Sequence, residues 1–301
     1  MIVSILSMLF LVLSSGTASE AVEVHEWGVV QTDEVTPFAV GARRGYLDDH
    51  GIIQPPEAMA VDAPVVWFHG PEFTGTFTVE VTDGYFTTLI PQPRSGGIQD
   101  EIQVQPQVSS AVWEDLECFP AEEIPRDRRA TPGFYVYEEY EWAMDFWRRV
   151  PSLTVSYSQA NYLDRFIYYE CSASGIFRND DPFSDYSGEW LLFSQEDGDL
   201  SASLCSGLPA APAIEETDLP EERVLEILAE WGEDRFLDEE ISALWMTWEP
   251  AFRTQCLVYG QEVFFLPLSH TQTEGISSLS LETDQGCPVS YCRLFLATGS
   301  I

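Results

Sequence analysis

Apolar and polar residues alternate with a period of two on both sides of Asp83-Gly84, a dipeptide that favours a tight turn between strands. Such alternation places every second side chain on the same face of a sheet. Reflection about this turn predicts a β-hairpin. Its mostly apolar face pairs Val81 with Phe86, Val79 with Thr88 and Phe77 with Ile90.

A second β-hairpin is predicted around Asp197-Gly198, which is the same kind of turn dipeptide. The flanking segments again alternate, so the register follows from reflection about the turn. One face pairs Phe193 with Ala202 and Leu191 with Leu204, and the other pairs Trp190 with Cys205 and Ser194 with Ser201.

Further short apolar runs are separated by connections rich in proline and glycine, which is typical of strands in sandwiches. They predict a mainly β protein built from sandwich-like antiparallel sheets. The runs are 63–69, 134–137, 153–157, 166–171, 256–259, 263–268, 277–282 and 292–297.

Helical spacing of apolar residues occurs in the C-terminal third. Asp218 is the predicted N-cap of a first helix, with Pro220 in its first turn and Gly232 at its end. A second helix is predicted over 234–248, and Pro250 is expected to stop it. The two helices predict an αα-hairpin packed on the sheets, so the fold class is α+β overall.

The N-terminus predicts export. Residues 2–13 form an apolar run interrupted by two serines, and small residues follow, so Ala18 or Ala21 could precede a cleavage site. The run is too short for a membrane span, which needs about 20 residues. We therefore expect a signal peptide over 1–21, no membrane insertion after its cleavage, and a secreted or periplasmic location.

The rest of the chain divides by composition into three segments. Residues 22–205 are predicted to form a β-rich domain. Residues 206–217, rich in proline, alanine and glutamate, are predicted to form a linker. Residues 218–301 are expected to hold the helical hairpin and C-terminal strands, packed on the same core.

The charge excludes several classes of function. The chain has 50 acidic residues against 14 basic ones, all of them arginine, for a net charge of −36. This charge repels phosphate backbones and disfavours nucleic-acid partners. The absence of lysine excludes Schiff-base chemistry and P-loop phosphate binding. A solvated acidic surface suited to a saline medium explains the charge, and binding of cations such as calcium is the alternative.

Six cysteines, an even number in a chain expected to be exported, favour disulfide bonds over metal ligation. Cys287 and Cys292 enclose four residues and could close a small loop. Cys171 and Cys205 could bridge neighbouring strands. Six cysteines allow 15 complete pairings, so the remaining connectivity stays open.

No standard catalytic signature is present, so the sequence does not decide whether the protein is an enzyme. The segment Val24–Gly28 nevertheless places His25 beside Glu26. On a strand their side chains point to opposite faces and cannot share one ion directly. His25 and Trp27 could be buried core residues of the first strand. Alternatively, His25 and Glu26 could supply a metal ligand or a general base.

Asn179, Asp181 and Asp185 lie in one acidic loop and are the candidate calcium ligands, because calcium prefers oxygen donors. Their spacing does not match the EF-hand loop. An acidic turn before a strand is the structural alternative.

The motif His25–Gly28 (HEWG) resembles the start of the mature chain in a family of uncharacterised exported bacterial proteins. Similar blocks follow in the family's order: 63–69 (APVVWFH), 84–93 (GYFTTLIPQP), 164–169 (DRFIYY) and 238–268, with its TW and LPL segments. The resemblance implies export and one architecture across most of the chain. It implies no established activity.

The chain departs from the family pattern at two places. Thr88, Leu89 and Ile90 stand where the family tends to have Glu, Trp and Tyr. His69 replaces a more usual Tyr, so the resemblance gives no reason to count it as a ligand. His25 and Glu26 remain as the polar motif residues with possible chemistry.

Three functions are therefore open. The first is a non-enzymatic binding or envelope-associated module with an unidentified extracellular ligand. The second is a metal-assisted extracellular hydrolase that uses His25 and Glu26. The third is a structural protein stabilised by calcium.

Overall fold

The computed structural model describes most of the chain. The predicted signal peptide up to residue 19, the predicted strand 134–137 and the candidate calcium loop lie outside the described residues. The described ranges are 20–31, 59–82, 84–93, 109–121, 123–129, 141–173, 186–209 and 211–301.

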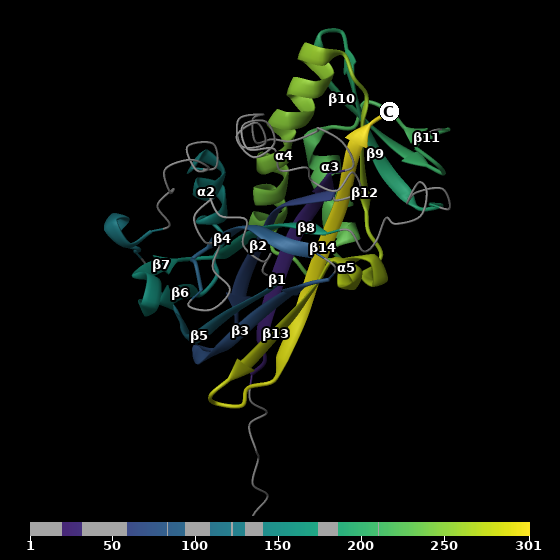
Figure 1. Cartoon of the computed structure of the whole chain (residues 1–301). Coiled ribbons are helices and arrows are strands. Elements are labelled where there is room, and N and C mark those ends of the chain that lie inside the picture. The colour runs from purple at the N-terminus through teal and green to yellow at the C-terminus, as the bar shows by residue number, and fades with distance from the viewer. Residues whose placement is uncertain are drawn as a thin grey trace, which may run out of the picture.

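The protein is mainly β, as predicted, with two multi-stranded sheets (Figure 1). The nine-stranded sheet has the order β11-β10-β9-β12-β14-β1-β2-β8-β4. Its strands are β1 (Val22–Gln31), β2 (Met59–His69), β4 (Gly84–Ile90), β8 (Ile167–Ala173), β9 (Glu189–Glu196), β10 (Asp199–Ser206), β11 (Ala213–Glu216), β12 (Val263–Pro267) and β14 (Val289–Ser300).

The five-stranded sheet has the order β13-β3-β5-β6-β7. Its strands are β3 (Phe73–Val81), β5 (Ser110–Phe119), β6 (Thr154–Tyr157), β7 (Tyr162–Asp164) and β13 (Ser277–Thr283). The helices are η1 (Arg126–Arg128), α2 (Glu141–Trp147), η2 (Ser158–Ala160), α3 (Glu221–Trp231), α4 (Asp238–Tyr259) and α5 (His270–Ile276).

Among the described strands, β1 and β14 pair in parallel and the other neighbours pair antiparallel. The expectation of purely antiparallel sheets is therefore wrong at this one pair. Parallel neighbours need a long crossover, and here nearly the whole chain lies between the two strands.

The nine-stranded sheet is covered on both faces. On one face Trp27 and Trp67 lie against α2, whose Trp147 carbonyl accepts a hydrogen bond from the Trp67 indole at 3.1 Å. On the other face Phe68 contacts Phe77 of the five-stranded sheet, with ring centroids 5.2 Å apart. A sheet covered on both faces needs nearly continuous apolar strands, and β1 is accordingly buried at nearly every position.

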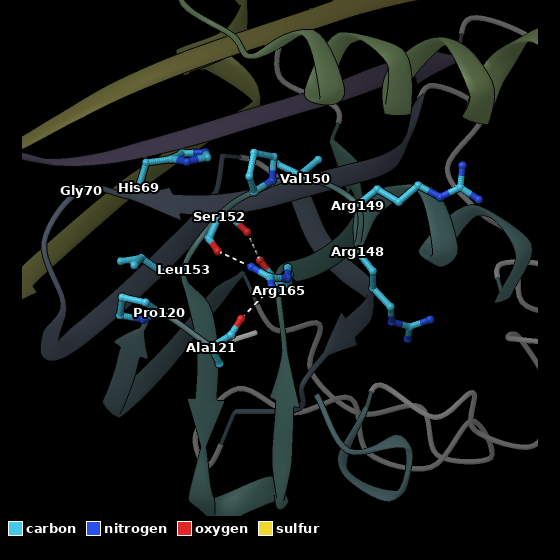
Figure 2. Close-up of a pocket in the computed structure, with 11 residues that line it drawn as sticks. His69, Gly70, Pro120, Ala121, Arg148, Arg149, Val150, Ser152, Leu153 and Arg165 are labelled. Carbon is cyan, nitrogen blue, oxygen red and sulfur yellow. Dashed lines mark hydrogen bonds between the residues drawn. The ribbon is translucent and has the colours of Figure 1, made fainter. Parts of the chain in front are cut away.

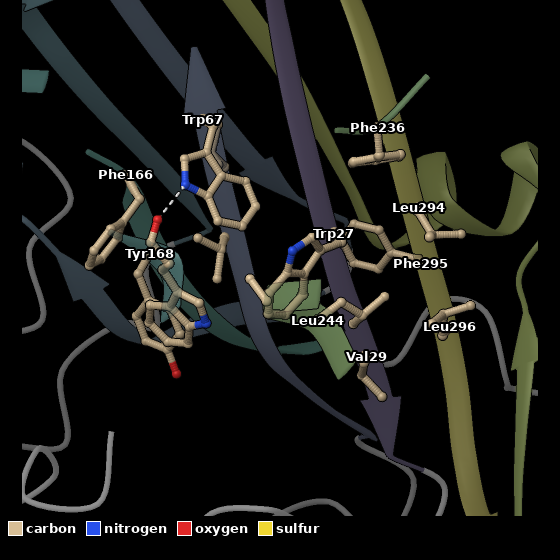
Figure 3. Packing of buried hydrophobic residues seen from close by; sticks show 14 of the residues in the cluster. Trp27, Val29, Trp67, Phe166, Tyr168, Phe236, Leu244, Leu294, Phe295 and Leu296 are labelled. Carbon is tan, nitrogen blue, oxygen red and sulfur yellow. Dashed lines mark hydrogen bonds between the residues drawn. The ribbon is translucent and has the colours of Figure 1, made fainter. Parts of the chain in front are cut away.

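The core is continuous between the layers. Trp27 is fully buried, and Figure 3 shows it between Trp67 of β2 and Leu294 of β14. Strands from before and after the predicted linker pair within the nine-stranded sheet, and the segment 206–217 itself contains β11, which pairs with β10.

The hairpin predicted around Asp197-Gly198 is confirmed: β9 and β10 pair in the predicted register, including Phe193 with Ala202 and Trp190 with Cys205. The hairpin predicted around Asp83-Gly84 is wrong. Val81 of β3 pairs with Ser277 in the five-stranded sheet, whereas Phe86 of β4 pairs with Cys171 in the nine-stranded sheet. The chain therefore changes sheets between Val81 and Gly84, and nonlocal partners decide the pairing.

The first predicted helix ends at Gly232, as expected. Its N-cap is Pro220 rather than Asp218, which has a positive φ of 54° and precedes the helix. No side chain caps the start of α3. The helix is therefore stabilised mainly by packing of its buried face, which includes Val224 and Leu228.

The second helix, α4, continues through Pro250 to Tyr259, so the predicted stop and the predicted strand 256–259 are both wrong. A proline inside a helix costs about 3 kcal/mol. Packing offsets this cost, because Phe252 stacks on Phe193 of β9 with ring centroids 4.6 Å apart. α4 lies against β9, β10 and β12 (Figure 1) and contacts α3; the αα-hairpin arrangement of the two helices stays a prediction.

None of the helices in the described ranges combines the length and apolar character that a membrane span requires.

All six cysteines are free thiols in the structure, and Cys287 and Cys292 are not joined. The predicted Cys171–Cys205 bridge is wrong. Cys171 lies on β8 and Cys205 on β10, with five strands of the sheet between them. A disulfide requires Cα atoms within about 7 Å, and neighbouring strands alone are about 4.8 Å apart.

We expect iodoacetamide at pH 8 to label Cys287 alone in the reduced native protein. Cys287 is half-exposed and the other five are buried. Burial raises the pKa of Cys205 and Cys256 to about 11 and that of Cys292 to about 12. Peptide mass spectrometry would check the pattern, with urea-denatured protein as the control in which all six react. Recovery of a Cys287–Cys292 cross-link from the purified protein would contradict the free-thiol structure.

Candidate metal centre

Three side chains that are distant in sequence meet where β1, β2 and the start of α4 lie together. His25 lies on β1, and His69 ends β2 two residues beyond Trp67, the register partner of His25. Residues at such diagonal positions on antiparallel strands share one face of the sheet. Glu240 lies in the first turn of α4, which places its carboxylate against both imidazoles.

The contacts within this group are short. His25 Nδ1 lies 2.9 Å from Glu240 Oε2, and His69 Nε2 lies 2.9 Å from Glu240 Oε1. The two imidazole rings have centroids 4.5 Å apart. His25 and Glu240 are buried, whereas the His69 side chain retains 14% exposure. The group is therefore approached from solvent on its His69 side.

A backbone hydrogen bond also holds the Glu240 carboxylate in place. The backbone N–H of Leu237 donates to Glu240 Oε2 at 2.7 Å, as part of the helix cap. Burial raises the pKa of Glu240, but hydrogen bonds and charge interactions with His25 and His69 outweigh this and lower the pKa below its ordinary value. Glu240 is consequently an ionised carboxylate held in one orientation.

This donor set fits a transition metal ion. One ligand atom each from His25, His69 and Glu240 all lie within 4.8 Å of one another. Zinc bonds of about 2.0–2.2 Å in a tetrahedral site place ligand atoms about 3.3 Å apart, so the two 2.9 Å contacts to Glu240 would lengthen by a few tenths of an ångström to admit the ion. Two imidazoles suit zinc or iron better than calcium, which prefers oxygen donors alone.

A further contact around His25 matches metal ligation. Its Nε2 is buried and has no hydrogen-bond partner among the described residues, but the Glu23 carboxylate lies 3.5 Å away. A histidine that ligates a metal through one nitrogen commonly offers the other N–H to a carboxylate. Glu23 is positioned for that role on the same strand face, and Phe236 covers the His25 ring edge-on at 5.4 Å.

Glu26 lies apart from this group, on the opposite face of β1, as the strand alternation predicts. Its carboxylate accepts hydrogen bonds from Arg293 Nε and the Tyr169 hydroxyl, each at 2.6 Å. Arg293 is the register partner of Glu26 on β14 and also donates to the Ser277 hydroxyl. The structure therefore brings His25 to a candidate metal centre and Glu26 to a buried ion pair.

Gly28, the glycine of the HEWG motif, lies where side chains of the neighbouring strands pack closely against β1. A Cβ at Gly28 would lie 2.9 Å from the Phe295 ring and 3.2 Å from Pro64. The pairing of β1 with β2 also shifts register between Trp27 and Val29. Gly28 thus allows β14 and β2 to approach β1 closely on the face that carries Glu26.

Sequence reasoning found one member of the centre and missed two. The family resemblance gives no reason to count His69, which replaces a tyrosine, yet His69 is the most exposed of the three. Glu240 is one of 50 acidic residues, and its signal was its place on the apolar face of α4, four residues before Leu244. The calcium candidates Asn179, Asp181 and Asp185 lie outside the described residues.

His69 also borders a cavity of about 640 Å³ (Figure 2). Its wall is formed by the end of β2, the residues after β5, the connection from α2 to β6, and Arg165. A volume of this size is within the range of small-molecule sites. The cavity places solvent-accessible space next to the exposed edge of the candidate metal centre.

Comparison with known proteins finds no similarity: no protein-family model matches the chain, and neither does a curated protein or a solved structure. The resemblance to the HEWG family stays a prediction from the motif order. The functional argument consequently depends on the chemistry of the site.

Proposed function

We propose that this chain is an exported, acidic, β-rich binding module that holds a divalent transition metal ion, zinc in the first instance, at His25, His69 and Glu240. The observation that carries the proposal is the convergence of two imidazoles and one ionised carboxylate from β1, β2 and α4. Three protein ligands leave a coordination position for water or an exogenous ligand. The module would act in the periplasm or outside the cell on an extracellular or envelope ligand, without nucleic-acid partners.

Each residue has a defined part in this proposal. His25 Nδ1 and His69 Nε2 supply the nitrogen donors, and Glu240 supplies negative charge that offsets the charge of the ion. Leu237 N–H orients Glu240. The Glu23 carboxylate, 3.5 Å from His25 Nε2, would accept the N–H of the ring when Nδ1 binds the ion. The acidic surface raises the local concentration of cations, which favours capture of the ion.

Isothermal titration with zinc tests the proposal on the mature protein. We expect about one tight site per chain, and at least about a hundredfold weaker binding in His69→Ala, since even residues that only orient ligands contribute 10–100-fold. His270→Ala is the matched control, because His270 is an exposed histidine on α5 outside the group. Equal zinc affinity in both variants, or no tight site in the wild type, would refute the metal centre.

A metal-assisted hydrolase is the second candidate, and the cavity beside His69 is the observation that favours it. In this version the metal activates a water in its open position. Glu26 has no part in it, because its carboxylate is bound to Arg293 and Tyr169 on the other face of β1. Zinc-dependent hydrolysis of a chromogenic ester, lost in His69→Ala and kept in His270→Ala, would favour the hydrolase over the non-catalytic module.

Calcium stabilisation through Asn179, Asp181 and Asp185 stays a separate proposal. Isothermal titration with calcium in place of zinc tests this proposal. Calcium binding that survives His69→Ala and disappears in the double variant Asp181→Asn/Asp185→Asn would support it. Calcium binding unchanged in that double variant would count against it.

A further inference from the structure

The cavity beside His69 differs in charge from the rest of the chain. Among the described residues its lining contains three arginines, Arg148, Arg149 and Arg165, and one histidine, with no aspartate or glutamate. The whole chain carries a net charge of −36. The basic lining creates a positive electrostatic potential in the cavity, opposite in sign to the charge of the whole protein. A positive potential attracts anions.

Arg165 is the best-placed donor in this cavity. Its Nη1 donates to the Ser152 carbonyl at 2.6 Å, and its Nη2 donates to the Ala121 carbonyl at 2.7 Å. Figure 2 shows the guanidinium held between these two groups. Neutral carbonyls fix the group without cancelling its charge, and three of its five N–H donors stay free of these two contacts.

The other two arginines have different surroundings. Arg148 is neutralised by Asp164, to which it donates from Nε and Nη2, and by Asp145. Arg149 is exposed, and its guanidinium lies over the Phe146 ring, 5.0 Å from the centroid. Neither Arg149 nor Arg165 has an ion pair with a carboxylate of the described part of the chain. Arg165 can therefore donate hydrogen bonds to a bound anion, and Arg149 adds to the positive potential that attracts it.

The remaining wall is partly apolar. Its exposed apolar residues are Pro120 and Pro151, whereas Val150 is fully buried and Leu153 nearly so. A ligand that matches this surface has one anionic end and an apolar body. Long polyanions do not match it, because the charge of the whole protein repels them outside the cavity.

We propose that this cavity binds a small molecule whose oxyanion, a carboxylate or a phosphate, pairs with Arg165 and whose apolar body lies against the exposed side chains of Pro120 and Pro151. The fork of the guanidinium suits either oxyanion, since both accept two parallel N–H bonds. The site is independent of the metal centre, although the two share His69 as a border. An occupant would lie next to the open side of that centre.

Binding is measured by NMR titration of the full mature protein in EDTA, so that failure of the zinc proposal does not affect the result. Phenyl phosphate and benzoate are the probes, inorganic phosphate tests the oxyanion alone, and benzyl alcohol tests the apolar body alone. We expect the Arg165 Nε–H resonance to shift with phenyl phosphate or benzoate. Arg165→Met should weaken that binding at least about tenfold, the loss expected for a charge-assisted bidentate pair.

Arg253→Met is the matched control, because it removes the same charge from an exposed arginine paired with Asp199 and Glu249 elsewhere on the surface. It should bind the probes as the wild type does. If Arg165→Met fails to fold, the Arg165 resonance in the wild type decides the question. Equal affinity for benzyl alcohol and phenyl phosphate, or an Arg165 signal that stays unchanged at saturation, would overturn the proposal.

Discussion

Zinc is expected to raise the free energy of unfolding of the wild-type protein by about 4 kcal/mol when free zinc is about a thousand times its dissociation constant. The reason is mass action, because the centre exists in the folded chain and its three ligands come from positions 25, 69 and 240. Urea unfolding with zinc and with EDTA, at matched ionic strength, measures the difference.

Glu240→Gln should abolish most of this zinc-dependent increment. The amide keeps the size of the side chain but removes the charge that neutralises the ion. His270→Ala should keep the full increment, since its side chain lies outside the centre. The comparison is made between zinc and EDTA within each variant, so any cost of the substitution to the metal-free fold cancels. An increment in Glu240→Gln equal to that of the wild type would contradict the assignment.

Glu26→Leu is expected to destabilise the protein by about 3 kcal/mol, because it removes the buried partner of the Arg293 charge and leaves only the exposed Glu274 carboxylate. The Arg293 side chain is 5% exposed, and Glu26 is fully buried. Burial lowers the pKa of Arg293, but its interactions with Glu26, Tyr169 and Glu274 together outweigh this and raise the pKa above its ordinary value. Because an arginine guanidinium keeps its charge in proteins, loss of Glu26 cannot be relieved by deprotonation of Arg293. Urea unfolding measures the cost.

The double variant Glu26→Leu/Arg293→Met should recover much of this loss, since replacing both partners of a buried pair by apolar residues is often neutral. Arg253→Met, which breaks exposed ion pairs, should change stability by less than about 1 kcal/mol. Zinc affinity should be the same in all folded variants of this pair. A double variant as unstable as the sum of the single variants would contradict the pairing, and weaker zinc binding in Glu26→Leu would contradict the separation of the two sites.

The four residues of the HEWG motif have four different surroundings, and strand alternation separates them. His25 and Trp27 face the helices, where one joins the candidate centre and the other fills the core. Glu26 and Gly28 face the opposite side, where one pairs with Arg293 and the other admits Phe295. The alternation was predictable from the sequence. The partners were not, because each comes from a strand or helix far away in the chain.

The candidate centre was predictable only in part for the same reason. A histidine in a short unusual segment attracts notice, but a carboxylate among 50 does not. Glu240 could have been found as an acidic residue on the apolar face of a helix, where burial without a partner is costly. His69 could not have been linked to His25 without the register of β1 with β2.

The sequence by itself determined the features that depend on neighbours along the chain. These are the mainly β class, the β9–β10 hairpin with its register, and the end of α3 at Gly232. Tight turns and helix ends are decided by a few adjacent residues, so local chemistry suffices.

The tertiary structure alone decided which sheet each strand joined and where α4 ended. The chain leaves the five-stranded sheet after Val81, although the turn there favours a hairpin, and α4 passes Pro250 because Phe252 packs against β9. It also decided the meeting of His25, His69 and Glu240. The free energy gained by burying apolar area against distant strands outweighs local turn and helix preferences of about 1–3 kcal/mol. The pattern within one segment does not show which distant strand it will be buried against.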